Sequence, residues 1–269
     1  MQNITDPDIV PYIPDGIGNS TDRQRIPAVL IIPGGAFRRL VYNFEGEDVA
    51  KWLNSMGIAA FVLECRLPSD EHDNAEDVPL IDAMRAMRVI RGRAQEFGID
   101  EAKIGVMGFS AGGFMAALLS TAYESDVYAD YKYKDEYDKL SARPDFAVCS
   151  YPVISIDDCI EAGKRYMSEE QVLERISDSK AKILHKYNPD KLVRPDMPPV
   201  FICETDDDRT TLSENSVGFY MAARKAGVSA ELHIFRTGGH GYGCGDDFAQ
   251  TGEWKVLFTK WIKSIGIIS

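Results

Sequence analysis

The chain has 269 residues, of which 45% are hydrophobic and 27% are charged, a composition typical of a globular protein. This length is sufficient for one large domain with a substantial buried core, and no linker, repeat or low-complexity tract divides the sequence. The formal net charge of -12 argues against nucleic acid as a partner, because the phosphate backbone is bound by clusters of lysine and arginine.

Membrane and metal partners are not expected either. No stretch approaches the roughly 18 consecutive apolar residues of a membrane-spanning helix, and residues 1–16 lack the basic start and apolar core of a secretory signal. The five cysteines form no C-x-x-C pair, which favours free thiols packed as small hydrophobic side chains over a zinc site or a disulfide framework. We therefore expect a cytoplasmic protein without a metal, and the sequence leaves open whether it forms a homo-oligomer.

Short apolar runs alternate with longer segments of helical period, which is typical of a mostly parallel β-sheet covered by helices on both faces. In chain order we expect a strand at 28–32, a helix at 46–56, a strand at 58–63, a helix at 78–97, a strand at 104–107, a helix at 112–123, strands at 146–151 and 200–204, a helix at 213–226, a strand at 230–235 and a helix at 252–265. This pattern predicts a single α/β domain over residues 1–269.

Two segments break the alternation. Residues 123–144 are rich in Tyr, Asp and Lys, and residues 154–197 have helix-like patterns without a strong strand. Both follow predicted strands on the side where ligand sites of open α/β sheets form, so one interpretation is an insertion or a partial lid. For residues 123–144, a solvated helix face is an equally good interpretation.

The stretch KIGVMGFSAGG at residues 103–113 places Ser110 between Gly108 and Gly112, where an apolar run ends and a helix-forming run begins. A strand that turns sharply into a helix leaves no room for side chains beside the turn, so glycines flank it and the serine hydroxyl is exposed near the positive end of the helix. G-x-S-x-G also occurs in ordinary loops, but this context favours a nucleophilic serine. A nucleotide loop is disfavoured because the chain lacks G-K-[ST] and G-x-G-x-x-G.

A serine nucleophile needs a base, and one of the four histidines stands apart. His240 lies between glycines, directly after the last predicted strand. His72, His185 and His233 lie in an acid-rich loop, a helical segment and a strand-like run respectively. A histidine bracketed by glycines is suited to a loop that presents an imidazole, so we interpret His240 as the base rather than as a turn residue.

The base needs an acid that orients it, and three consecutive aspartates follow the predicted strand at 200–204. These are Asp206, Asp207 and Asp208. A calcium loop would require further oxygen ligands at alternating positions, and none follow in a recognisable spacing. Spacing alone does not choose among the three aspartates.

The attack of a serine on an ester creates an oxyanion, which needs backbone N–H donors already in place. The N–H of Ala111, directly after the nucleophile, is one predicted donor. Gly35 and Ala36 are the others, since the run Pro33-Gly34-Gly35-Ala36 after the first predicted strand lets the backbone approach a ligand closely. An ordinary glycine turn is the alternative interpretation of that run.

The chain order serine, aspartate, histidine is that of α/β-hydrolases. The sequence resembles that superfamily, and within it the acetyl-esterase or carbohydrate-esterase-like (BD-FAE-like) group related to acetylxylan and feruloyl esterases. The resemblance covers nearly the whole chain, through the segments PGGAF, GIAAFVLECRLP, GFSAGG, SARPDFAVCSYPVIS, PPVFICETDDD, ENS and GGHGYG. Aligning Glu214-Asn215-Ser216 with the family pattern implies that Asp208 is the catalytic acid, with Asp207 as the alternative.

The chain departs from the family pattern at several positions, which are Thr211-Leu212 in place of Val-Pro, Ala36 in place of a third glycine, Glu204 in place of a histidine and Cys65 in place of a tyrosine. Alanine keeps its backbone N–H, so we expect the oxyanion site to persist. These changes bear on substrate preference more than on the reaction.

The resemblance implies a serine esterase that hydrolyses a short acyl ester, above all an acetyl ester, with a sugar as one candidate for the alcohol part, and that needs no metal or organic cofactor. Its partner would be a small-molecule ester. One alternative is a serine peptidase of the prolyl-oligopeptidase type, which usually carries an additional propeller. A second is a non-catalytic α/β-hydrolase that binds a small ligand, which would be expected to lose Ser110, Asp208 or His240.

Overall fold

A seven-stranded β-sheet runs through the part of the chain that the computed structural model describes, which is residues 7–16, 25–68, 74–129, 135–177, 182–245 and 250–269. The strand order is β1-β3-β2-β4-β5-β6-β7, and every neighbouring pair is parallel except β1 with β3. The strands are β1 (Asp8–Tyr12), β2 (Ile26–Ile32), β3 (Ala59–Glu64), β4 (Ile99–Phe109), β5 (Ala147–Ser150), β6 (Val200–Thr205) and β7 (Ala230–Phe235).

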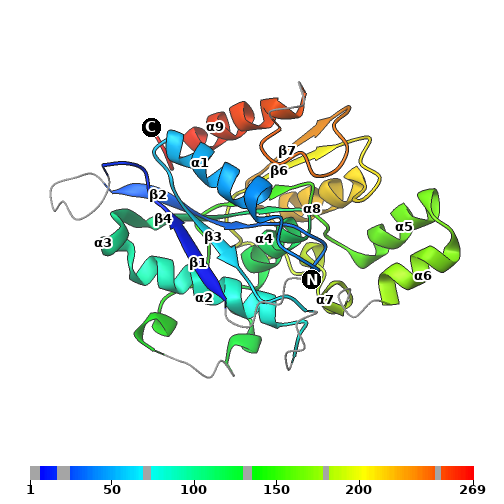
Figure 1. The fold of residues 1–269 in the computed structure, drawn as a ribbon, viewed down its shortest axis with the longest axis horizontal. Coiled ribbons are helices and arrows are strands. Elements are labelled where there is room, and N and C mark those ends of the chain that lie inside the picture. Colours follow the sequence, from blue (N-terminus) through cyan, green and yellow to red (C-terminus); the bar gives the residue numbers. More distant parts are fainter. Residues whose placement is uncertain (1–6, 17–24, 69–73, 130–134, 178–181, 246–249) are drawn as a thin grey trace.

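Helices cover both faces of the sheet (Figure 1). They are α1 (Asp48–Ser55), α2 (Val78–Gly92), α3 (Ala94–Phe97), α4 (Ala111–Ala122), α5 (Ile156–Tyr166), α6 (Glu169–Ser177), α7 (Lys182–Lys186), α8 (Ser213–Lys225) and α9 (Trp254–Ser264). Within β2, Leu30 joins the buried cluster under α2, α4 and α8, whereas Val29 and Ile31 join the cluster under α1 and α9. Because successive side chains of a strand point to opposite faces, both faces must be apolar, and this explains the continuous apolar runs in the sequence.

The predicted fold class and all six predicted strands are confirmed. Within the described residues the sequence analysis missed one strand, β1, which pairs antiparallel with β3 at the edge of the sheet. It was missed because it is partly exposed and contains Pro11, which weakens a strand pattern except at a sheet edge. All five cysteines lie in the described part of the chain and are buried, as expected.

Several predicted boundaries were wrong. β4 begins at Ile99, five positions before the predicted 104; this start was missed because residues 100–103 are partly or fully exposed and polar or small, so no apolar run marks them. The predicted helix over 78–97 is two helices, α2 and α3, separated at Arg93. The predicted helix start at 46 lies inside a π-helical turn, Asn43–Glu47, that precedes α1.

The two segments that break the alternation differ in structure. In residues 123–144 the described part forms short 3-10 turns, and Arg85 of α2 pairs with Asp135 (2.5 Å) and Asp138 (3.0 Å). In residues 154–197 the described part contains α5, α6 and α7, and Figure 1 shows α5 and α6 projecting from the body of the molecule. The remainder of both segments, residues 130–134 and 178–181, lies outside the described residues.

The packing of the sheet predicts opposite effects for two glycine-to-alanine changes. A Cβ on Gly105 in β4 would overlap the ring of Phe146, which is fully buried, so Gly105→Ala should lower the free energy of unfolding by about 1–3 kcal/mol. Gly218 is exposed in α8 with open space around it, so Gly218→Ala should raise the free energy of unfolding by up to about 1 kcal/mol. Urea unfolding of both variants tests this, and equal effects of the same sign would contradict it.

Candidate active site

Ser110 sits on a sharp turn between β4 and α4. Its backbone has φ 53° and ψ -117°, a conformation that costs a non-glycine residue about 1–3 kcal/mol and persists only where the surroundings impose it. The surroundings do so here by close packing. A Cβ on Gly108 would overlap the carbonyl oxygen of Gly112, and a Cβ on Gly112 would overlap the carbonyl oxygen of Ile32 at the end of β2. At both glycines of the G-x-S-x-G motif, a side chain would therefore clash with a backbone carbonyl group.

The structure brings Ser110, His240 and Asp208 into one hydrogen-bonded line. Ser110 Oγ lies 2.8 Å from His240 Nε2, and His240 Nδ1 lies 2.6 Å from Asp208 Oδ2. Ser110 comes from the β4–α4 turn, His240 from the loop after β7 and Asp208 from the loop after β6. Parallel strands place these three loops at the same edge of the sheet. The arrangement can move a proton from the serine hydroxyl to an imidazole whose tautomer is held by a carboxylate.

The three consecutive aspartates have different partners. Asp208 contacts the imidazole, and its side chain is buried. Asp207 Oδ1 instead accepts hydrogen bonds from the backbone N–H groups of Gly238 (2.9 Å) and Gly239 (2.8 Å). Asp206 is exposed, and its Oδ1 lies 3.5 Å from Ser213 Oγ. Asp207 thus holds the loop that carries His240 but does not contact the imidazole ring.

Asp208 is held as a carboxylate by several donors. Burial by itself raises the pKa of this carboxyl, but hydrogen bonds from His240, Thr211 and Thr210 outweigh burial and leave the pKa below its usual range. The N–H groups of Thr210 (2.6 Å) and Thr211 (3.0 Å) donate to Oδ1, and the Thr211 hydroxyl donates to Oδ2 (2.9 Å). Thr211 Oγ1 also lies 3.2 Å from His240 Nδ1. Sequence reasoning noted Thr211 only as a departure from a family pattern and missed this contact.

The loop after β2 packs directly against Ser110. A Cβ on Gly34 would lie 3.0 Å from Ser110 Cβ, and one on Gly35 (φ 132°) would overlap the carbonyl oxygen of Arg39. Ala36 and Phe37 both have φ 56°, in the left-handed region that non-glycine residues rarely adopt. Ala111 is the first residue of α4, where backbone N–H groups have no partner within the helix. The predicted donors Gly35, Ala36 and Ala111 therefore lie in the two segments that adjoin Ser110.

Sequence reasoning also missed a buried pair beside this loop, Glu45 and Tyr151. Glu45 lies in the π-helical turn before α1, and Tyr151 follows β5. Glu45 Oε2 accepts a hydrogen bond from the Gly34 N–H (2.8 Å), and Glu45 Oε1 accepts one from the Tyr151 hydroxyl (2.9 Å). Burial raises the pKa of Glu45 despite these hydrogen bonds. The available signals were an acidic residue at the start of a predicted helix and a tyrosine at the carboxyl end of a predicted strand.

A further buried carboxyl, Glu204, is the penultimate residue of β6 and lies four positions before Asp208. Burial, together with the neighbouring Asp208 carboxylate, holds the pKa of Glu204 well above its usual range. The Thr205 N–H (2.9 Å) and the Ser216 hydroxyl (3.3 Å) donate to it. Glu204 contacts neither Ser110 nor His240 through a hydrogen bond among the described residues. Glu204 is therefore a neighbour of Asp208 that does not contact the serine or the imidazole.

The two other histidines in the described part of the chain lie on different elements and form no part of this line. His233 is on β7, as predicted, and its Nε2 lies 2.8 Å from Glu231 Oε1. His185 is in α7, as predicted, and His72 lies outside the described residues. In the described ranges, no group of three or more His, Cys, Asp or Glu side chains is arranged to hold a metal ion. No helix in those ranges is long and apolar enough to span a membrane.

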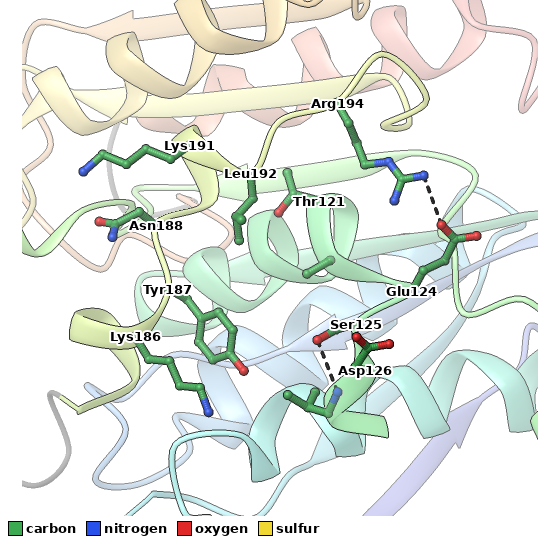
Figure 2. Close-up of a pocket in the computed structure, with 12 residues that line it drawn as sticks. Thr121, Glu124, Ser125, Asp126, Lys186, Tyr187, Asn188, Lys191, Leu192 and Arg194 are labelled. Carbon is green, nitrogen blue, oxygen red and sulfur yellow. Dashed lines mark hydrogen bonds and ion pairs between the residues drawn. The ribbon is translucent and has the colours of Figure 1, made fainter. Parts of the chain in front are cut away.

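A separate cavity of about 580 Å³ lies at the opposite end of α4 from Ser110, and Figure 2 shows its lining residues. Its cations are paired with acidic side chains: Lys186 Nζ lies 2.7 Å from Asp77, and Arg194 lies 3.0 Å from Glu124. Its lining includes none of the predicted site residues. The candidate active site is therefore the edge of the sheet that holds Ser110.

The sequence of the chain is similar to a known protein family and to two curated proteins. Residues 17–222 match the model of the BD-FAE family. An acetylxylan esterase of Xylanibacter ruminicola is 31% identical over 240 residues, which is 88% of this chain and 45% of that protein. Endo-1,4-beta-xylanase B of Butyrivibrio fibrisolvens is 31% identical over 227 residues, which is 84% of this chain and 34% of that protein. The chain thus spans less than half the length of these curated relatives.

Solved structures of similar fold cover nearly the whole chain. An acetyl ester-xyloside bifunctional hydrolase from Caldicellulosiruptor lactoaceticus has a TM-score of 0.78 and 36% identity, covering 98% of this chain and 89% of that one. The carboxylesterase Cest-2923 from Lactobacillus plantarum has a TM-score of 0.79 at 21% identity, covering 97% of this chain and 94% of that one, which bears on the fold alone. The esterase Est2 of Thermogutta terrifontis, bound to propionate, has a TM-score of 0.75 at 25% identity, covering 100% and 93%.

The lowered pKa of Asp208 predicts a stability difference that depends on pH. A carboxyl whose pKa is lower in the folded than in the unfolded protein, where it is about 3.9, stabilises the fold above that value and loses this contribution as the pH falls through the folded pKa. The stability advantage of the wild type over Asp208→Asn should therefore shrink between about pH 5 and pH 3. Urea unfolding across this range, with the exposed Asp206→Asn as control, measures it. An advantage that stays constant or grows towards pH 3 would contradict this prediction.

Proposed function

The chain belongs to the BD-FAE family and has the α/β-hydrolase fold, and on this premise we propose that it is a serine esterase that hydrolyses short-chain acyl esters. The observation that carries the proposal is the line of hydrogen bonds from Ser110 through His240 to the buried Asp208. A hydroxyl that donates to an imidazole oriented by a carboxylate is the arrangement needed for acyl transfer to serine.

In the proposed first step, Ser110 Oγ attacks the ester carbonyl carbon while His240 Nε2 takes the hydroxyl proton. The bond from that carbon to the leaving alcohol then breaks, and His240 returns the proton to the alcohol oxygen. In the second step a water molecule gives a proton to His240 and its oxygen attacks the acyl carbon. The bond to Ser110 Oγ breaks, and Oγ recovers its proton. Asp208 keeps the proton of the imidazole on Nδ1 in the resting enzyme and stabilises the imidazolium.

The negative charge on the former carbonyl oxygen needs backbone donors. We assign this role to the N–H groups of Ala111, Ala36 and Gly35. The close approach of the loop at Gly34 to Ser110 and the position of Ala111 at the start of α4 support this assignment. Such donors act from fixed positions in a site with little water, and each contributes about 100-fold to 1,000-fold to the rate.

For the substrate we propose an acetyl ester, on a xylose-containing carbohydrate. The support is the similarity to an acetylxylan esterase and to an acetyl ester-xyloside bifunctional hydrolase. The solved structures at 36% and 25% identity are an ester hydrolase and an esterase, which favours an esterase over a peptidase of the prolyl-oligopeptidase type. The presence of Ser110, His240 and Asp208 together favours an enzyme over a non-catalytic ligand-binding protein. The five buried thiols favour a reducing compartment, which we propose to be the cytoplasm.

Removal of the proposed nucleophile should abolish the reaction. We expect Ser110→Ala to lower kcat for p-nitrophenyl acetate by about 1,000-fold or more, because the acyl-enzyme can no longer form. The same variant should lose labelling by a fluorophosphonate probe. Ser55→Ala, an exposed serine at the end of α1, is the matched control and should retain both. Hydrolysis at the wild-type rate by Ser110→Ala would contradict the assignment of Ser110 as the nucleophile.

The three aspartates should differ in a defined order. Asp208→Asn should lower kcat by about 1,000-fold to 10,000-fold, because the imidazole loses the carboxylate that orients it. Asp207→Asn should cost about 10-fold, since it weakens only the hydrogen bonds to the loop of His240. Asp206→Asn should stay within about 2-fold of wild type, as expected for an exposed side chain. Steady-state kinetics on p-nitrophenyl acetate measures the order, and a larger loss for Asp207→Asn than for Asp208→Asn would transfer the acid role to Asp207.

A further inference from the structure

A buried carboxyl that takes no part in the proposed proton transfers lies at the centre of the candidate site. Glu45 is only 4% exposed, and both of its carboxyl oxygens are occupied. Oε2 accepts from the Gly34 N–H at 2.8 Å, and Oε1 accepts from the Tyr151 hydroxyl at 2.9 Å. Because the oxygens face the protein, Glu45 is not placed to act on a substrate as an acid or a base.

The hydroxyl of Tyr151 extends this contact to the histidine loop, residues 236–245. The Gly243 N–H donates to the Tyr151 hydroxyl oxygen at 3.0 Å. A tyrosine has a single hydroxyl proton, which is directed to Glu45 here. The hydrogen bonds therefore run in one direction from Gly243 through Tyr151 to Glu45, where a second donor arrives from Gly34. This chain joins the loop after β2 to the loop that carries His240.

Tyr151 is itself anchored next to Ser110. The carbonyl of the preceding residue, Ser150, accepts the Ser110 N–H at 3.0 Å, and the Tyr151 N–H donates to the Cys203 carbonyl of β6 at 2.7 Å. Tyr151 has φ 36°, so its backbone is held in a conformation that a tyrosine does not adopt freely. Its ring meets the ring of His240 edge-on, with centroids 5.1 Å apart. Because the backbone of Tyr151 is held in place, its side chain contacts the imidazole and Glu45 from a fixed position.

Packing alone does not require this pair. A buried carboxyl pays a desolvation penalty, and an apolar side chain of similar volume commonly gives equal or greater stability. The benefit lies instead in the groups that Glu45 and Tyr151 hold. Gly34 precedes the proposed donors Gly35 and Ala36, and Gly243 lies three residues after His240.

We infer that Glu45 and Tyr151 are positioning residues that fix the loop after β2 and the histidine loop against Ser110 before a substrate binds. This inference rests on the proposed esterase function, because the alignment of the N–H donors with His240 matters only if Ser110 attacks an ester. Misaligned donors stabilise the transition state less and affect the bound substrate little. The loss should therefore appear in kcat and leave KM nearly unchanged.

The test compares Glu45→Gln and Tyr151→Phe with Tyr187→Phe. Tyr187 is a buried tyrosine that donates a hydrogen bond to Asp77 away from the candidate site, so its change removes the same kind of bond. With p-nitrophenyl acetate, we expect kcat to fall about 10-fold to 100-fold for Glu45→Gln and about 10-fold for Tyr151→Phe, with KM within about 3-fold of wild type. Tyr187→Phe should stay within about 2-fold in kcat.

Two further measurements separate positioning from a general loss of structure. The affinity for a trifluoromethyl ketone, which forms a tetrahedral adduct with a nucleophilic serine, should fall in proportion to kcat/KM across the variants. The double variant should lose little more kcat than the more impaired of the two single variants, because both changes break the same chain of hydrogen bonds. If Glu45→Gln does not fold, Tyr151→Phe supplies the same comparison, since it removes the connection between Glu45 and Gly243.

The possible outcomes are distinct. If wild type hydrolyses the ester but both variants keep kcat within about 3-fold, or raise KM alone, the positioning role is wrong and the proposed function stands. If wild type neither hydrolyses the ester nor reacts with a fluorophosphonate, the proposed function fails and the positioning role falls with it. A selective loss of kcat with a parallel loss of affinity for the ketone supports both.

Discussion

The contact between Gly112 and the carbonyl of Ile32 is the constraint on which the candidate site depends. It lets the start of α4 lie directly against the end of β2, closer than any side chain would permit. The turn that carries Ser110 and the loop that follows β2 therefore pack against each other. A Cβ on Gly34, in that loop, would accordingly lie only 3.0 Å from Ser110 Cβ. The parallel order of β4, β5, β6 and β7 brings the loops after β5, β6 and β7 to the same edge.

The three buried carboxyl groups near that contact, Asp208, Glu204 and Glu45, lie in different environments and therefore differ in pKa. Asp208 is surrounded by donors and stays ionised in spite of burial, whereas Glu204 lies beside that charge and has its pKa raised. Glu45 receives one N–H and one hydroxyl, and burial still raises its pKa. Chemically identical groups on neighbouring segments thus differ through the number and kind of their donors. The sequence reveals the carboxyl groups, but the donors come from the folded backbone.

A feature could be predicted from the sequence where it depends on residues close together in the chain, and could not where it depends on residues far apart. Five of the six predicted strands have buried cores, so each was visible as an apolar run in its own residues. The edge strand β7 was recognised although Glu231 and His233 interrupt its apolar residues, whereas β1, which is partly exposed at the other edge, was not. Ser110 and His240 stand out because neighbouring glycines mark a backbone turn. The distinction between Asp207 and Asp208 depends on how the chain turns after β6, and spacing could not supply it. Glu45 and Tyr151 are 106 positions apart, so their pairing had no local signature.

One consequence of the fold concerns how the two halves of the site open to solvent. Residues 114–121 of α4 are all buried inside the helix, so we expect their amide protons to exchange with solvent only in large unfolding events. His240 lies instead in a glycine-rich loop of intermediate exposure beyond the edge strand β7. Such a loop can open locally while the sheet stays intact. We therefore expect amide exchange to be slower on the serine side of the site than at residues 238–241, the half-buried part of the loop that carries His240.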